Sequence, residues 1–133
     1  MDIPKLITAA LAAREQAYAP YSRFYVGAAL LTGEGRVYTG CNIENGAYPA
    51  GNCAERTAVF KAVSEGERDF AAIAIVGGPA GSAPQALCPP CGICRQVLSE
   101  FCSADFTVIL AKSAQDYEVH TLGELLPLAF SLD

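Results

Sequence analysis

Three cysteines in two short segments have the spacing of metal ligands. Cys91 and Cys94 are separated by two residues at the start of an expected helix, so their sulfur atoms lie on neighbouring sides of one turn. This arrangement suits tetrahedral zinc, and Cys53, which opens another expected helix, supplies a third sulfur. Helix N-termini carry partial positive charge and favour the thiolate form. Three protein ligands leave the fourth position to water, which is typical of a catalytic zinc site.

A carboxylate follows the first of these cysteines at a distance of two residues. Glu55 lies about 200° further round a helix than Cys53, so it does not share the ligand face. Zinc can lower the pKa of its bound water to about 7, which makes hydroxide available at neutral pH. We therefore expect Glu55 to act as a base beside this water and to deliver the proton to a ring nitrogen and then to a leaving amine.

The charge of the predicted site requires a nearby cation. Three thiolates on a divalent ion leave a net negative charge, which weakens zinc as a Lewis acid. Arg56 lies three residues after Cys53, and Arg95 directly follows Cys94. Either guanidinium can donate a hydrogen bond to a thiolate, and we favour Arg56.

The other cysteines and the single histidine are the candidates for a fourth ligand, which would make the site purely structural. Cys88 also precedes a cysteine, but two prolines between it and Cys91 prevent a helical turn, so this pair is the weaker choice. We expect His120 on the edge of a strand, and Cys41 and Cys102 as buried thiols. The catalytic interpretation is therefore favoured.

Composition and charge exclude several classes of protein. The chain has 133 residues, 52% of them hydrophobic, which fits one domain spanning residues 1–133. A net charge of -5, with nine Lys and Arg, gives no basic stripe for nucleic acid. No apolar run approaches the roughly 20 residues of a membrane span, and the first residues lack signal-peptide features. We expect a cytoplasmic protein, in which clustered cysteines indicate a metal and not disulfides.

The pattern of apolar residues predicts the elements that must position the cysteines. The first part of the chain has a helix at 4–18, a hairpin of strands at 26–31 and 37–41, and a loop at 42–52. The pattern after residue 52 predicts a helix at 53–66, a strand at 71–76 and a loop at 77–89. It then predicts a helix opened by Pro89 and Pro90, strands at 106–110 and 117–120, and a short helix at 122–126. This order indicates an α/β layered domain with a mixed sheet.

Four longer segments carry a resemblance to a known family. The pattern Cys-x-Glu followed by Pro-Cys-x-x-Cys is the all-cysteine form of the zinc deaminase signature. The chain resembles the small homotetrameric cytidine deaminases in segments 19–24 (APYSRF), 40–45 (GCNIEN), 52–58 (NCAERTA) and 90–97 (PCGICRQV). The resemblance extends through residue 127 and implies a three-layer α/β fold with a mixed five-stranded sheet between helices. The Gly/Pro-rich stretch before Pro90 is longer than the family pattern and adds Cys88.

The resemblance implies a reaction and roles for individual residues. One zinc ion per chain, bound by the three cysteines, would serve the hydrolytic deamination of free cytidine or 2'-deoxycytidine to uridine or 2'-deoxyuridine and ammonia, with Glu55 as the proton shuttle. The resemblance implies that Asn42 and Glu44 bind the ribose hydroxyls, that Phe24 packs on the nucleoside, and that the backbone at Ala54 contacts the base. A carboxylate at Glu44 suits neutral hydroxyls and would repel phosphate.

The resemblance also implies a homotetramer with shared sites. Phe130 matches an aromatic residue that reaches into the site of a neighbouring subunit, and residues 125–130 form an apolar tail that a monomer would have difficulty covering. Two alternatives stay open at this point. One is a related deaminase that acts on a nucleotide, an aminonucleoside antibiotic or an RNA base, and the other is a zinc-stabilised module without catalysis.

Overall fold

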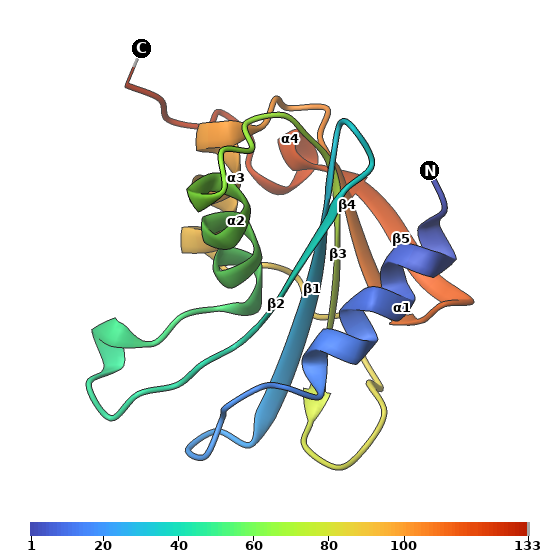
Figure 1. Cartoon of the computed structure of the whole chain (residues 1–133), viewed down its shortest axis with the longest axis vertical. Coiled ribbons are helices and arrows are strands. Elements are labelled where there is room, and N and C mark those ends of the chain that lie inside the picture. Colours follow the sequence, from blue (N-terminus) through green and yellow to red (C-terminus); the bar gives the residue numbers. More distant parts are fainter. Residues whose placement is uncertain (133) are drawn as a thin grey trace.

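A five-stranded sheet lies at the centre of the fold, with the strand order β2-β1-β3-β4-β5 (Figure 1). The computed structural model describes residues 1–132. Strands β3 and β4 pair in parallel, whereas the other neighbouring strands are antiparallel, which confirms the predicted mixed sheet. The strands are β1 (Phe24–Thr32), β2 (Val37–Cys41), β3 (Phe70–Pro79), β4 (Thr107–Ser113) and β5 (Asp116–Thr121).

Helices cover both faces of the sheet and complete a three-layer α/β structure. Helix α1 (Ile3–Arg14) packs on one face, while α2 (Ala54–Ser64), α3 (Gly92–Phe101) and the short α4 (Leu122–Leu125) lie on the other (Figure 1). Successive residues of a strand face opposite sides, so Ala28 joins the core under α2 whereas Ala29 joins the core under α1. Within residues 1–132, the helices are too short or too polar for a membrane span.

The first helix is shorter than the sequence predicts. The pattern predicts a helix at 4–18, but α1 ends at Arg14. The backbone N–H of Tyr18 donates to the carbonyl of Asn42, and its own carbonyl accepts from the N–H of Glu44. These tertiary hydrogen bonds take the backbone groups that a longer helix would use, so the predicted C-terminal end was wrong.

Strand β3 is longer than predicted and takes the first three residues of the expected loop at 77–89. Gly77 and Gly78 pair with Val26 and Tyr25 of β1. A Cβ atom on Gly77 would lie 2.7 Å from the Sγ of Cys88, so the absence of a side chain allows the later part of the loop to pack against the strand.

A buried arginine connects the start of β1 with the end of β3. Arg14 is 5% exposed, and its guanidinium donates to the carbonyl oxygens of Tyr25 and Gly78, each at 3.0 Å, and of Pro79 and Ser82, each at 2.8 Å. These four carbonyls belong to two segments that flank the site described below. Arg14 therefore fixes the position of both segments relative to α1.

Candidate metal centre

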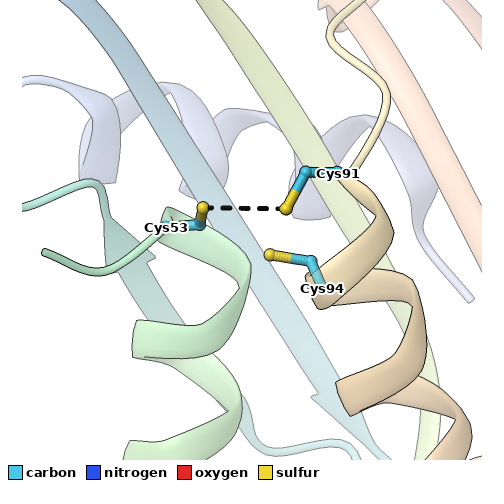
Figure 2. Close-up of side chains that lie close together, drawn as sticks. All are labelled: Cys53, Cys91 and Cys94. Atoms are coloured by element: carbon cyan, nitrogen blue, oxygen red, sulfur yellow. Dashed lines mark hydrogen bonds between the residues drawn. The ribbon is translucent and has the colours of Figure 1, made fainter. Parts of the chain in front are cut away.

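The N-terminal ends of α2 and α3 bring the three predicted cysteines together. Cys53 is the N-cap residue of α2, Cys91 is the N-cap residue of α3, and neither makes a side-chain capping hydrogen bond. Cys94 is buried in the first turn of α3. Figure 2 shows the three side chains pointing toward one another from the two helices.

The distances between the sulfur atoms fit one zinc ion. All three Sγ atoms lie within 4.8 Å of one another, and those of Cys53 and Cys91 are 4.0 Å apart. Sulfur ligands about 2.3 Å from a tetrahedral zinc ion are about 3.8 Å from one another. Small side-chain movements would therefore give the geometry of a zinc site.

The pKa values of Cys53 and Cys94 are shifted in opposite directions. A hydrogen bond with Cys94, together with the guanidinium of Arg56, lowers the pKa of Cys53 to about 5 although burial opposes this. The same contact with Cys53, with burial, raises the pKa of Cys94. The guanidinium of Arg56 thus favours the thiolate form of Cys53, and binding of a cation would favour the thiolate form of Cys94 as well.

Arg56 and Arg95 have different partners. The Nη2 of Arg56 donates to the Sγ of Cys53 at 3.1 Å, and its buried Nε has no hydrogen-bond partner among residues 1–132. Arg95 instead donates to the carbonyl oxygens of Pro90 and Leu125, at 2.7 and 2.6 Å. Of the two arginines weighed from the sequence, Arg56 is the one whose guanidinium contacts a thiolate.

Glu55 lies in the first turn of α2 and is only 5% exposed. Burial raises the pKa of its carboxyl group to about 7, and the negative charge of Cys53 adds to this effect. A carboxyl group with such a pKa can both hold and release a proton near neutral pH. Its position directly after the ligand-bearing turn puts that exchange beside the candidate metal.

An open cavity of about 560 Å³ adjoins the metal centre. Its lining includes Cys53 and Arg56 from the centre, and Asn42 and Glu44 from the loop after β2. The other lining residues come from the loops around it: Tyr21, Ser22, Ile43, Asn45, Tyr48, Gly51 and Asn52. The volume is of the size that small-molecule sites have.

Asn42 and Glu44 also make hydrogen bonds to the start of β1 and to the loop that precedes it, respectively. The side chain of Asn42 accepts from the N–H of Val26 at 2.9 Å and donates to the carbonyl of Phe24 at 2.8 Å. The Oε1 of Glu44 accepts from the N–H groups of Tyr21 and Ser22. Hydrogen bonds from the Ser22 side chain and from this backbone hold the pKa of Glu44 below its usual range, so it stays ionised.

The remaining predicted binding residues lie outside the lining of the cavity. Phe24 is the first residue of β1, and its side chain is 41% exposed beside Gly77. Ala54 is fully buried at the first position of α2. Phe130 is 64% exposed in the segment after α4. In a single chain, none of these three residues lines the cavity that Asn42 and Glu44 line.

Two aromatic residues that the sequence did not single out also line the cavity. Tyr21 is 61% exposed, and Tyr48, in the short 3-10 helix Tyr48–Ala50, is 81% exposed. Both tyrosines occur in loops rich in Gly, Asn, Pro and Ser, and that setting was the available signal for a surface function.

The alternative ligands do not join the cluster formed by the described residues. His120 on β5 instead lies 2.9 Å from Glu118. Burial raises the pKa of Cys88 to about 11 and that of Cys102 to about 12. Cys41 and Cys102 are of intermediate burial, less than expected, and Cys102 packs against the core between the sheet and α2; both lie at the ends of elements, where packing is incomplete.

Comparisons with known proteins agree with this geometry. The model of the cytidine and deoxycytidylate deaminase zinc-binding region matches residues 2–110, which contain all three cysteines and Glu55. The chain belongs to this deaminase family. The zinc-binding region of the family thus coincides with the cysteine cluster, which makes zinc the cofactor of the site.

Two cytidine deaminases and one solved structure of a cytidine deaminase match nearly the whole length of this chain. A cytidine deaminase of Sporosarcina psychrophila is 54% identical over 131 residues, covering 98% of this chain and 93% of the relative. A cytidine deaminase of Halalkalibacterium halodurans is 53% identical over 133 residues, covering 100% and 97%. The crystal structure of cytidine deaminase from Burkholderia pseudomallei superposes with a TM-score of 0.86 at 51% identity and covers 95% of this chain and 97% of that one.

Proposed function

We propose that this protein is a zinc-dependent cytidine deaminase, which hydrolyses cytidine and 2'-deoxycytidine to uridine and 2'-deoxyuridine with release of ammonia. One observation carries the proposal. Three cysteine sulfurs with the spacing of zinc ligands lie beside a buried carboxyl group whose pKa is about 7, at the edge of an open cavity. The high identity to cytidine deaminases supports this choice of substrate.

In this proposal Cys53, Cys91 and Cys94 hold the zinc ion and Glu55 moves the protons. When bound, zinc supplies an activated water, because it can lower the pKa of that water to about 7. Glu55 would take up the proton of the attacking water and donate it to the ring nitrogen of cytosine. It would then take up a second proton, from the hydroxyl group added at C4, and donate it to the leaving 4-amino group. Burial of the Glu55 carboxyl group limits proton exchange with bulk water.

Arg56 compensates the charge of the ligands. Its hydrogen bond to the Sγ of Cys53 draws electron density from one of three thiolates, which would otherwise leave the centre with a net negative charge. Arg56 therefore tunes the metal without binding it.

Substrate binding is assigned to two residues that line the cavity and to two that lie outside its lining. Asn42 and Glu44 bind the ribose hydroxyls, the backbone at Ala54 contacts the base, and Phe24 packs on the nucleoside. The ionised carboxylate of Glu44 repels a phosphate group, which favours free nucleosides over nucleotides.

The assembly in this proposal is a homotetramer, and the compartment is the cytoplasm. Phe130 lies outside the cavity of its own chain, and the exposed apolar residues Leu128 and Leu132 flank it. Phe130 of one subunit would cover the substrate of another. The whole chain, residues 1–133, acts as one domain in pyrimidine salvage.

An ultraviolet assay with zinc-loaded protein tests the function. Cytidine and 2'-deoxycytidine should be converted, whereas cytidine 5'-monophosphate should react much more slowly because of Glu44. Protein stripped of zinc by a chelator is the matched control and should be inactive until zinc is restored. A protein with one zinc ion per chain that leaves both nucleosides unchanged would instead be a structural zinc module.

A further inference from the structure

The chain after α4 lies against α3, the helix that carries two of the three cysteines. The Nη1 of Arg95 donates to the carbonyl oxygen of Leu125 at 2.6 Å. The Nε2 of Gln96 donates to the carbonyl oxygen of Phe130 at 3.2 Å. Two consecutive residues of α3 thus hold the carbonyl of the last residue of α4, directly before segment 126–130, and the carbonyl of Phe130 at the end of this segment. Figure 1 shows the segment passing α3 on its way to the C-terminus.

The backbone between these two hydrogen bonds has an unfavourable conformation. Leu128 has a φ of 54°, in the left-handed region that residues with a Cβ atom rarely adopt. Its side chain is fully exposed, so no burial of Leu128 compensates for this conformation. Such a conformation persists when contacts on either side fix it. The hydrogen bonds from Arg95 and Gln96 are contacts of this kind.

Arg95 also contacts the turn that contains a metal ligand. Its Nε donates to the carbonyl oxygen of Pro90 at 2.7 Å, and Pro90 directly precedes Cys91. One guanidinium therefore joins the start of α3 to the beginning of the C-terminal segment. Its two acceptors are neutral carbonyl groups, so Arg95 has no acidic partner to neutralise. It fixes the start of α3 relative to the end of α4.

We propose that Arg95 and Gln96 are positioning residues that form a clip, which holds segment 126–130 in the conformation that presents Phe130 to a second copy of the chain. The step from segment to catalysis rests on the proposed function, in which Phe130 covers the substrate of a neighbour. Phe130 is 64% exposed in its own chain, so its ring is available for this contact. A segment that is ordered before association loses less conformational entropy when it binds.

The variant Gln96→Leu removes the donor at one end of the clip and keeps a side chain of similar size. We expect KM to rise about fivefold, the effect of losing one ordinary hydrogen bond, with kcat and zinc content unchanged. Hydrogen exchange of the amides in segment 126–130 should become faster. Gln96→Lys, which still offers a donor, should restore most of the wild-type KM. Glu100→Gln, at an exposed position of the same helix, should change none of these quantities.

A double variant tests whether the clip acts through Phe130. In a Phe130→Ala background, Gln96→Leu should cause no further rise in KM, since the ring it positions is absent.

Arg95→Lys provides an independent variant, because one ammonium group cannot reach both carbonyls, and it should also accelerate exchange in segment 126–130. A KM effect that persists in the Phe130→Ala background, or unchanged exchange in both clip variants, would overturn the proposal. If the wild type fails to deaminate cytidine, the proposed function is wrong, and hydrogen exchange of segment 126–130 in the two clip variants still decides on the clip.

Discussion

Glu55 is the residue on which the proposed chemistry depends most directly. Glu55→Gln keeps the size and the burial of the side chain but cannot carry a proton. We expect zinc content to be retained and kcat to fall by about 10²- to 10⁴-fold, the usual contribution of a positioned acid and base. Metal analysis and steady-state kinetics on the same sample check this, and activity within a few-fold of wild type would remove Glu55 from the mechanism.

The cysteines allow a second prediction at the scale of single residues. Cys91→Ala and Cys94→Ala should each lose zinc, because two sulfurs do not complete the ligand set. Cys88→Ala and Cys102→Ala should keep one zinc ion per chain, since burial keeps both thiols protonated outside the cluster. Metal analysis of the four purified variants decides the assignment, and loss of zinc from Cys88→Ala would show that the ligand pair is wrong.

Among single residues, those at the starts of helices could be predicted from the sequence better than those on loops. The cluster of Cys53, Cys91 and Cys94 follows from helical geometry, because each cysteine lies at or near a helix start. Tyr21 and Tyr48 could not be found in the same way. Their places on the cavity depend on how two loops fold over each other, and local periodicity carries no information about that.

At the scale of elements, the position of α2 depends on a close contact with β2. A Cβ atom on Gly40 would lie 2.4 Å from the carbonyl oxygen of Ala54 and 2.5 Å from the backbone nitrogen of Ala58. We expect Gly40→Ala to lower the free energy of unfolding by about 1–3 kcal/mol, as overpacking usually does. Displacement of the first turn of α2 should also reduce kcat. Thermal unfolding and kinetics of the zinc-loaded protein measure the two effects.

Gly92→Ala is the matched control for this prediction. A Cβ atom on Gly92 would meet no atom within 4 Å, and alanine favours a helix by up to about 1 kcal/mol over glycine. The variant should therefore be at least as stable as wild type. Equal stability of Gly40→Ala and Gly92→Ala would mean that β2 and α2 can separate without cost.

The existence and type of the α-helices and strands were predictable from the sequence, whereas several of their ends were not. Helix α3 starts at Gly92 and not at the two prolines, and β4 runs to Ser113, three residues beyond the predicted end. Alternating and helical spacings of apolar residues reflect the layers directly. The end of α1 at Arg14 depends on hydrogen bonds between Tyr18 and the loop after β2. The extension of β3 to Pro79 depends on its pairing with β1 and on room for Cys88. Both ends are set by tertiary partners distant in sequence.

At the scale of the whole molecule, the proposed homotetramer shares its sites between subunits. Phe130→Ala should raise KM and weaken the oligomer while zinc content stays unchanged, because the ring lies outside the cavity and the metal centre of its own chain. Kinetics, sedimentation and metal analysis provide the three measurements. A wild-type protein that is monomeric at assay concentration would exclude the shared site and leave the deaminase chemistry possible.

Mixing two weakened variants tests directly whether each site is built from two subunits. Hybrids of Phe130→Ala and Glu55→Gln chains contain some sites with an intact Glu55 and an intact Phe130 from different subunits. The activity of the mixture should therefore exceed the sum of the two parents. The absence of such an excess, in a mixture where exchange of subunits has been demonstrated, would contradict the shared site.

The two helix starts at the metal centre also carry a trade-off between stability and function. Serine or aspartate at an N-cap position typically stabilises a helix by about 1 kcal/mol relative to residues that cannot cap. Cys53 and Cys91 make no such hydrogen bond, whereas Thr121 forms a complete capping box on the four-residue α4. In the zinc-free chain, a capping residue at either position would therefore raise stability, whereas in the loaded protein the binding of zinc to both cysteines stabilises the folded state and more than offsets the missing caps.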